Sequence, residues 1–220
     1  MPNAPIARFR LYGFIDTAYL GKRDAGDVAR ELITGGVDIL QVRAKKSSHA
    51  QRVEIALKAV SAASGHDVPV IINDDIDAAF ETEADGVHLG QEDWAALGGR
   101  EERLQRLANM RIVGLSTHSL EQALAAERDG ADYIGVGPVF PTGTKPGVKP
   151  VGVELVRAVS ARVTVPFFAI GGITLTNVSQ VLEAGATRVA VVSAILEAPD
   201  IEKATARLKQ RLMEPRIDAN

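Results

Sequence analysis

The segment GVGPVFPTGTKPG, residues 135–147, changes character halfway along its length. Its first half is apolar, as in a buried strand, and its second half carries polar groups among glycines and prolines. These groups are the hydroxyls of Thr142 and Thr144 and the ammonium group of Lys145. A solvated turn is the usual structure for such a composition. A functional loop is the alternative, and it requires other charged residues at the same end of the fold.

A second polar set ends a β-rich run over residues 38–44. Gln41, Arg43 and Lys45 alternate along the chain, so in a strand their side chains point to the same side. In a closed barrel that side is the interior, where a guanidinium and an ammonium group need anionic partners. A frayed strand end with solvated charges is the alternative explanation.

Carboxylates follow the next two predicted strands, residues 69–74 and 86–90. They belong to Asp74, Asp75, Glu92 and Asp93. An aspartate after a strand is often a helix N-cap, and Asp75 or Asp77 fits that role. Carboxylates from two neighbouring strands beside a basic set also suit a hard cation with oxygen ligands, and we expect Mg²⁺ here.

Two later strand ends carry the features of an anion site. AIGGIT contains Gly171 and Gly172, and VVSAI contains Val192 and Ser193. A glycine pair permits close backbone approach, and free N–H groups at the start of a helix attract an anion. In barrel enzymes the loops after strands seven and eight form a recurrent phosphate site. A tight turn without a ligand is the alternative.

The strand end GLSTHS places Ser116 two residues before His118. Ser119 and Gln122 have the spacing of a capping box, which predicts the start of a helix. His118 is therefore either an exposed neighbour of that cap or a functional group. His88, within an apolar run, is interpreted as a buried histidine that makes hydrogen bonds.

The elements that position these residues alternate regularly. Runs that are apolar on both faces, as in a buried parallel sheet, predict strands at residues 10–16, 38–44, 69–74, 86–90, 111–117, 133–140, 166–172 and 188–194. Helical spacing of apolar residues lies between them, in one case at Val53, Ala56, Leu57 and Val60, and in another at Leu175, Val178 and Leu182. Glycines in GGVD, GADY and GATR end helices just before strands.

Eight strand–helix units in 220 residues give about 27 residues per unit, the rhythm of a compact (β/α)₈ TIM barrel of the α/β class. We predict one barrel domain over residues 1–220, with about eight N-terminal and seven C-terminal residues at its periphery. A doubly wound open sheet is the second choice, since eight units without a long break favour closure.

Composition excludes several classes of function. The net charge of −3 does not indicate a nucleic-acid partner, and without cysteine there is no disulfide, thiolate catalysis or cysteine-bound zinc. There is no apolar run near 20 residues and no signal-like N-terminus, so we expect a cytoplasmic protein without membrane contact. A homo-oligomer is compatible with the sequence, because an exposed apolar helix face cannot be told from a buried one.

Together these strand ends predict a basic clamp, a magnesium site and two separate anion sites on one rim, as two phosphorylated small molecules would require. The motifs QVRAK, IND, GVHLGQED, STHS, GPVFPTGTK, AIGGI and VVSAI, in this order, resemble those of the thiamine phosphate synthase family. The resemblance covers about residues 10–195. It implies a (β/α)₈ barrel that joins 4-amino-2-methyl-5-hydroxymethylpyrimidine diphosphate to a thiazole phosphate and releases diphosphate.

The resemblance also implies a role for each matching residue. The pyrimidine diphosphate would bind Gln41, Arg43, Lys45 and Asn73, and Ser116 would contact its pyrimidine or diphosphate. Mg²⁺ would bind Asp74 and Asp93. The thiazole phosphate would bind Thr142 and Thr144, with its phosphate on backbone N–H groups of Gly171 or Gly172, Val192 and Ser193. Lys145 would hold the departing diphosphate. Ile15 stands where the family more often has a hydroxyl residue, and we assign no role to Asp16.

The implied reaction is dissociative: the bond to diphosphate breaks, and the thiazole nitrogen attacks the resulting aminopyrimidine methylene cation. Such chemistry needs neutralised leaving-group charge more than a strong base. Arg43, Lys45, Ser116 and Lys145 are the expected catalytic residues. A thiazole tautomerase of the same superfamily, with His118 in proton transfer, is the nearest alternative, but it would not need a diphosphate clamp. A non-catalytic phosphate-binding barrel would not need the metal carboxylates.

Overall fold

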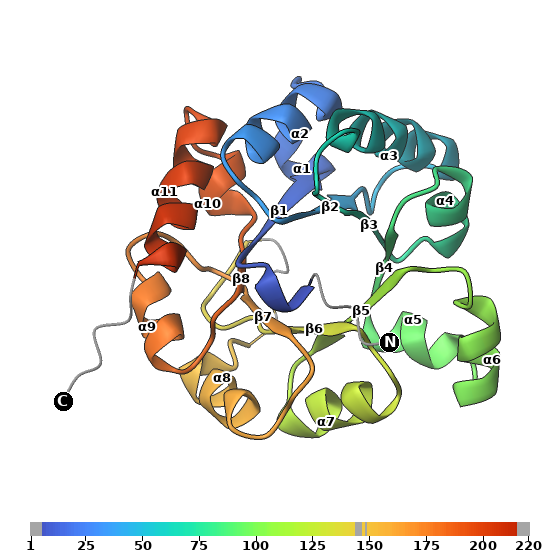
Figure 1. Cartoon of the computed structure of the whole chain (residues 1–220), viewed down its shortest axis with the longest axis vertical. Coiled ribbons are helices and arrows are strands. Elements are labelled where there is room, and N and C mark those ends of the chain that lie inside the picture. Colours follow the sequence, from blue (N-terminus) through green and yellow to red (C-terminus); the bar gives the residue numbers. More distant parts are fainter. Residues whose placement is uncertain (1–5, 144–146, 148, 215–220) are drawn as a thin grey trace.

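The eight strands form a closed parallel barrel in which every strand pairs with its neighbours in chain order and β8 pairs with β1 (Figure 1). This computed structural model describes residues 6–143, 147 and 149–214. The strands are β1 Leu11–Asp16, β2 Ile39–Arg43, β3 Val70–Asn73, β4 Gly86–Leu89, β5 Ile112–Thr117, β6 Tyr133–Val136, β7 Phe167–Ile170 and β8 Val189–Ala190. The closed barrel is confirmed, and the open sheet is wrong.

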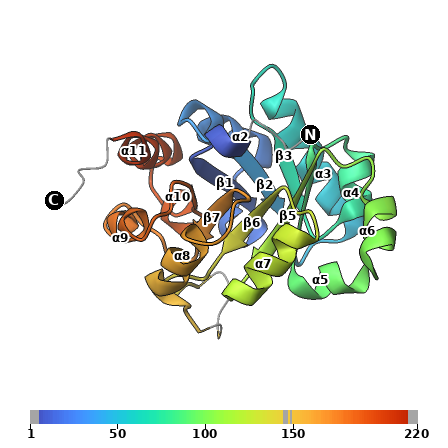
Figure 2. The same ribbon diagram turned by 60° about the horizontal axis from the view of Figure 1, so that its bottom comes forward.

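Helices surround the ring of strands in both views (Figures 1 and 2). They are α1 Thr17–Leu20, α2 Ala25–Thr34, α3 His49–Ala63, α4 Ile76–Glu81, α5 Gln91–Ala96, α6 Arg100–Arg106, α7 Leu120–Arg128, α8 Gly152–Ser160, α9 Val178–Glu183, α10 Ser193–Leu196 and α11 Ile201–Met213. A short 3₁₀ turn, η1 Ile6–Arg8, precedes β1, and its Ile6 is fully buried. Within the described residues no helix is both long and apolar enough to cross a membrane.

Two predicted strands are too long. The chain leaves the β6 ladder after Val136, where the backbone N–H of Val139 donates to the Ile170 carbonyl at 2.8 Å from within a loop. Pro138 has no N–H to continue a ladder. β8 ends at Ala190 because the chain turns into α10 at Ser193. Both departures bring loop backbone to the mouth of the barrel.

The predicted helix faces are right in part. In α3 the buried residues are Val53, Ala56, Ala59 and Ala63, whereas Leu57 is 49% exposed. Leu175 lies before α9 and is 45% exposed, so it does not belong to the helix face assigned to it. Three of the four buried residues of α3 are alanines, whose small side chains allow a helix to pack closely.

The predicted helix ends follow the sequence signals closely. Gly36, Gly130 and Gly185 have φ values of +94°, +90° and +101°, as expected for glycines that end helices. Ser119 caps α7 by accepting from Gln122 N. The full capping box is wrong, because the Gln122 side chain accepts from the N–H of His118 and not from that of Ser119. His118 is held at the start of α7 by this bond.

Aromatic rings fill the interior of the barrel below its mouth. Tyr12 stacks on Phe14, and both Tyr12 and Tyr133 make edge contacts with Phe168, at centroid distances of 5.1 to 5.6 Å. Tyr133 fits because Gly114 faces it: a β-carbon at Gly114 would lie 2.1 Å from Tyr133 Cζ. These rings form the floor on which the functional site rests.

Candidate active site

One cavity opens at the carboxyl ends of the strands and collects most of the residues singled out in the sequence. It is lined by Gln41, Arg43, Asn73, Ser116, Thr142, Gly171, Gly172, Val192 and Ser193. They come from β2, β3 and β5, from the loops after β6, β7 and β8, and from the first residue of α10. Strand ends of a barrel converge on one mouth, so residues far apart in the sequence meet here. Thr144 and Lys145 lie outside the described residues.

Arg43 is held by a residue to which the sequence assigned no role. Asp16 and Arg43 are opposite each other in the β1–β2 register, and Arg43 Nη1 donates to Asp16 Oδ2 at 2.6 Å. Asp16 is almost fully buried and also caps α1 by accepting from Ala18 N at 3.0 Å. The expected anionic partner of Arg43 is therefore part of the protein. The matched positions of Asp16 and Arg43 at two adjacent strand ends are the signal that would have revealed the pair.

Lys45 does not lie inside the barrel with Gln41 and Arg43. β2 ends at Arg43, and the turn that follows sends Lys45 into an adjoining cavity, which it lines with Asn73, Asp74 and Asp93. Lys45 Nζ lies 3.1 Å from Asp74 Oδ2, and its side chain is half exposed. The alternation argument was wrong for this residue because it continued a strand past its end. Asn73 lines both cavities and joins them.

Asp74 and Asp93 form a close carboxylate pair. Asp74 has a φ of +63°, a left-handed conformation that Asp tolerates better than most residues, and its N–H donates to the His88 carbonyl. Burial raises the pKa of Asp93, and the nearby carboxylate of Asp74, which is hydrogen-bonded to it, raises it further. Two carboxylates that resist ionising together are stabilised by a cation between them, so their chemistry fits a divalent ion.

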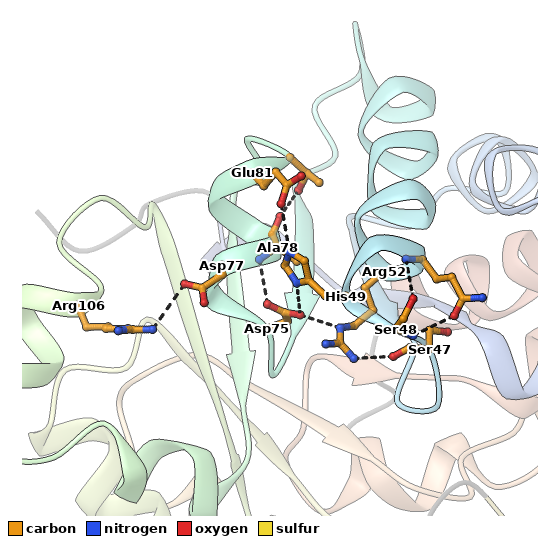
Figure 3. Close-up of polar contacts among 11 residues, drawn as sticks. Ser47, Ser48, His49, Arg52, Asp75, Asp77, Ala78, Glu81 and Arg106 are labelled. Atoms are coloured by element: carbon orange, nitrogen blue, oxygen red, sulfur yellow. Dashed lines mark hydrogen bonds and ion pairs between the residues drawn. The ribbon is translucent and has the colours of Figure 1, made fainter.

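The other carboxylates of this region do not join the pair. Glu92 is exposed and lines neither cavity. Asp75 caps α4 by accepting from Ala78 N at 2.9 Å, as one of the two cap alternatives predicted. It also accepts from Arg52 Nε at 2.7 Å and contacts His49 Nδ1 at 3.2 Å (Figure 3). Asp75 therefore ties α3 to α4 beside the carboxylate pair.

The four residues Gly171, Gly172, Val192 and Ser193, here named the phosphate cup, form one side of the cavity. Gly171 and Gly172 have positive φ values, and a β-carbon at Gly172 would lie 2.4 Å from the Pro141 carbonyl oxygen. The glycines therefore let the loop after β6 pack on the end of β7. They do not begin a helix as predicted, since α9 starts at Val178.

The second part of the cup does begin a helix. Ser193 is the first residue of α10, and Val192 precedes it with no side-chain cap. Among the described residues, the backbone N–H groups of Gly172 and Ser193 donate to no protein acceptor. Unpaired N–H groups in a cavity are suited to an anion. The anion site predicted for these two loops is therefore geometrically available.

The two histidines of the cavity differ in their surroundings. His118 is partly buried and its Nδ1 is hydrogen-bonded to the Gly137 carbonyl, so a neutral ring presents an unprotonated Nε2. His88 is buried, as predicted, and makes hydrogen bonds at 2.9 Å to Tyr133 Oη and Ser116 Oγ. The sequence did not indicate that His88 also lines the cavity.

Fold and site together define a (β/α)₈ barrel of the enzyme type, whose mouth is lined by groups suited to bind anions. A family model described as thiamine monophosphate synthase matches residues 11–195. The thiamine-phosphate synthase of Halalkalibacterium halodurans is 43% identical over 209 residues, covering 94% of this chain and 97% of that protein. That of Chloroflexus aurantiacus is 40% identical over 210 residues, 95% of each chain.

Solved structures agree with the sequence comparison. Thiamine phosphate pyrophosphorylase from Pyrococcus furiosus matches with a TM-score of 0.83 and 34% identity, over 94% of this chain and 96% of that one. A 3-hexulose-6-phosphate synthase matches with a TM-score of 0.63 at 20% identity, a likeness of fold alone. The chain belongs to the thiamine-phosphate synthase family.

Proposed function

We propose that this barrel carries out its family's reaction by joining 4-amino-2-methyl-5-hydroxymethylpyrimidine diphosphate to a thiazole phosphate, with release of diphosphate. The observation that carries the proposal is the meeting of two separate sets of anion-binding groups at one mouth. Arg43, Asn73 and the phosphate cup line the main cavity. Lys45 and the carboxylate pair Asp74 and Asp93 line the adjoining cavity, which Asn73 shares.

The diphosphate would lie where the two cavities meet. Arg43, already oriented by Asp16, and Lys45 would neutralise its charge, and Asn73 would donate its amide hydrogens to it. Asp74 and Asp93 would hold Mg²⁺ there, and the bound ion would add positive charge next to the leaving group. Lys45 would then leave its ion pair with Asp74 and bind a diphosphate oxygen instead. Lys145, from the predicted loop, would complete the clamp on the leaving group.

The thiazole phosphate would occupy the opposite side of the mouth. Its phosphate would accept from the N–H groups of Gly172 and Ser193, which donate to no acceptor in the part of the chain that the structure describes. Thr142 and Thr144 would contact the same substrate. Holding the phosphate there fixes the ring nitrogen relative to the pyrimidine methylene carbon. Such positioning lowers the entropy cost of joining two substrates.

The order of bond changes follows from the available groups. The carbon–oxygen bond to diphosphate breaks with both electrons going to oxygen, and the clamp of Arg43, Lys45 and Lys145 stabilises that charge. The thiazole nitrogen then donates its lone pair to the electron-poor methylene carbon. Neither step transfers a proton, so the cavity needs no general base. One preorganised charge contact of this kind contributes about 3 to 4 kcal/mol to lowering the barrier.

The deciding experiment supplies both phosphorylated substrates with Mg²⁺ and measures thiamine phosphate. The synthase assignment requires stoichiometric thiamine phosphate and diphosphate. The second candidate is isomerisation of a thiazole carboxylate phosphate, which is favoured by one observation, the position of His118 in the cavity lining with its Nδ1 hydrogen-bonded to the Gly137 carbonyl. Isomerisation of that compound with no thiamine phosphate formed would overturn the proposal.

A further inference from the structure

A continuous chain of hydrogen bonds crosses the floor of the cavity from β2 to β5. Gln41 Nε2 donates to Tyr12 Oη at 2.8 Å, and Tyr12 Oη lies 2.8 Å from Tyr133 Oη. Tyr133 Oη lies 2.9 Å from His88 Nδ1, and His88 Nε2 lies 2.9 Å from Ser116 Oγ. We name these five residues the polar chain. All five line the cavity, and its two ends are residues assigned to the pyrimidine substrate.

The donors and acceptors within the polar chain allow one direction throughout. Burial raises the pKa of both Tyr12 and Tyr133 well above the usual range, so each hydroxyl keeps its single proton. Tyr12 accepts from Gln41, and either tyrosine can be the donor in the Tyr12–Tyr133 bond. In the arrangement where every hydroxyl proton of the chain meets an acceptor, Tyr12 donates to Tyr133 and Tyr133 donates to His88 Nδ1. A neutral imidazole whose Nδ1 accepts carries its proton on Nε2, so His88 donates to Ser116 Oγ.

This direction determines what each end offers to a ligand. Gln41 uses its amide N–H₂ in the chain, so its Oε1 is left as an acceptor. Among the described residues, no donor contacts Gln41 Oε1. If Oε1 were also buried it would be a buried atom without a partner, but within the described residues only Arg188 Nε is such an atom. Gln41 Oε1 is therefore accessible, and Gln41 lines the cavity. Ser116 accepts from His88, so its own proton is left to donate. The polar chain therefore offers a ligand an acceptor at its Gln41 end and a donor at its Ser116 end.

We propose that Tyr12, Tyr133 and His88 are positioning residues that hold Gln41 Oε1 as an acceptor and Ser116 Oγ as a donor, and so select a 4-aminopyrimidine over its 4-oxo analogue. This inference rests on the proposed function. The amino group supplies N–H for Gln41, and an unprotonated ring nitrogen accepts from Ser116. The 4-oxo analogue places a carbonyl acceptor against the acceptor Gln41 Oε1.

The alternative role of the polar chain is to satisfy buried hydroxyls in the core. A structural role predicts that breaking the chain impairs all substrates alike. A role in selection predicts that the impairment depends on the substrate. A site built around a substrate N–H typically rejects an analogue that lacks it by about 10⁴-fold in kcat/KM. The ratio of the kcat/KM values for the amino and the 4-oxo substrates therefore separates the two roles.

Tyr133→Phe breaks the chain at its middle while keeping the ring. Without Tyr133 Oη, the tautomer of His88 is no longer determined, and Tyr12 can donate to a reversed Gln41 amide. We expect kcat/KM for the amino substrate to fall about 10-fold or more while that for the 4-oxo diphosphate rises or holds, so their ratio shrinks at least 10-fold. An unchanged ratio would overturn the inference.

Two further variants keep the test decisive. Tyr12→Phe breaks the chain one bond earlier and should shrink the same ratio, even if Tyr133→Phe folds poorly. Phe168→Leu is the matched control, because Phe168 packs on both tyrosines at 5.1 and 5.6 Å but carries no polar group. It should alter turnover of both substrates equally. A ratio that shrinks as much in Phe168→Leu as in the tyrosine variants would contradict the proposal.

A second readout needs no substrate turnover. In ¹⁵N-histidine NMR of the substrate-free protein, His88 should show an unprotonated Nδ1 and a protonated Nε2. The chain has four histidines, and the signals of His88 are assigned by their loss in His88→Gln. Tyr133→Phe should shift His88 toward a mixture of tautomers. A protonated Nδ1 in the unsubstituted protein would overturn the inference. Absence of thiamine phosphate with the expected tautomer would instead overturn the proposed function.

Discussion

Asp16 and Arg43 face each other at the carboxyl ends of two adjacent strands, joined by a hydrogen bond of 2.6 Å. The pair is desolvated: the side chain of Asp16 is 1% exposed and that of Arg43 is 12% exposed. The carboxylate of Asp16 therefore neutralises the guanidinium of Arg43, as a bound phosphate would. It also holds the guanidinium in place before a substrate binds. A cation that we propose binds the diphosphate is thus fixed before the substrate arrives.

Asp16→Asn should leave the cap on α1 but remove the charge opposite Arg43. Breaking a buried ion pair by removing one partner costs about 3 kcal/mol, so we expect the free energy of unfolding to fall by about that amount. We also expect kcat/KM to fall about tenfold, because Arg43 loses its orientation. Urea unfolding and steady-state kinetics measure both effects.

Asp27→Asn is the control for that variant. Asp27 pairs with Arg30 on α2, and both side chains are more than 60% exposed. Exposed pairs contribute at most about 1 kcal/mol, so stability should barely change and activity should not change. Equal losses in the two variants would show that burial of the Asp16–Arg43 pair contributes nothing.

Magnesium dependence is expected to rest on the carboxylate pair. Asp93→Ala should raise the Mg²⁺ concentration needed for half-maximal activity by about tenfold or more, because an oxygen ligand is lost. Glu92→Ala, one residue earlier and equally exposed but outside both cavities, should leave the titration unchanged. A Mg²⁺ curve for Asp93→Ala that overlays that of the unsubstituted protein would exclude the ligand role.

The fold was predictable because its signals are local. Alternation of apolar runs with helical patterns predicted the barrel, and Gly36, Gly130 and Gly185 ended helices where expected. Lys45 was misplaced because sequence periodicity does not show where a strand ends. The ends of strands carried most residues of the cavity, since a barrel brings those ends together whatever their spacing in the chain.

The polar chain was not predictable in the same way. Tyr12 and Tyr133 stand in apolar strands and are typical of core aromatics, 121 residues apart in the sequence. Their hydroxyls meet because β1 and β6 face each other across the barrel interior, and no local pattern reports such a contact. Asp16 was missed for a related reason: its partner lies on the neighbouring strand, and only the register aligns them.

Gly172→Ala should disturb the phosphate cup. At Gly172 the φ is +63° and a β-carbon would meet the Pro141 carbonyl oxygen at 2.4 Å, so the loop after β6 must move. We expect KM for the thiazole phosphate to rise about tenfold, with a smaller change in KM for the pyrimidine diphosphate. Gly130→Ala is the control, since φ is +90° there with nothing within 4 Å, and it carries only the backbone strain. A uniform rise in both KM values would contradict the assignment of the cup to one substrate.

His49 should make stability depend on pH. Its ring bridges Glu81 on α4 and Asp75 before α4, at 3.1 and 3.2 Å (Figure 3). These hydrogen bonds, that of Glu81 first, raise the pKa of His49 above its usual value. A raised pKa in the folded state means that the protonated form stabilises the fold. This stabilisation is complete below the ordinary histidine pKa, about 6.5, and is lost as the pH rises through the folded value.

His49→Gln should therefore lower the urea midpoint at pH 6 and leave it nearly unchanged at pH 9, relative to the unsubstituted protein. Glu81→Gln removes the first partner and should shrink the same pH-dependent difference without removing His49. Arg52, which also pairs with Asp75, is kept in both variants, so its contact is the same in each comparison. A difference that grows from pH 6 to pH 9 would have the opposite sign, and it would show that His49 stabilises the fold as the neutral ring.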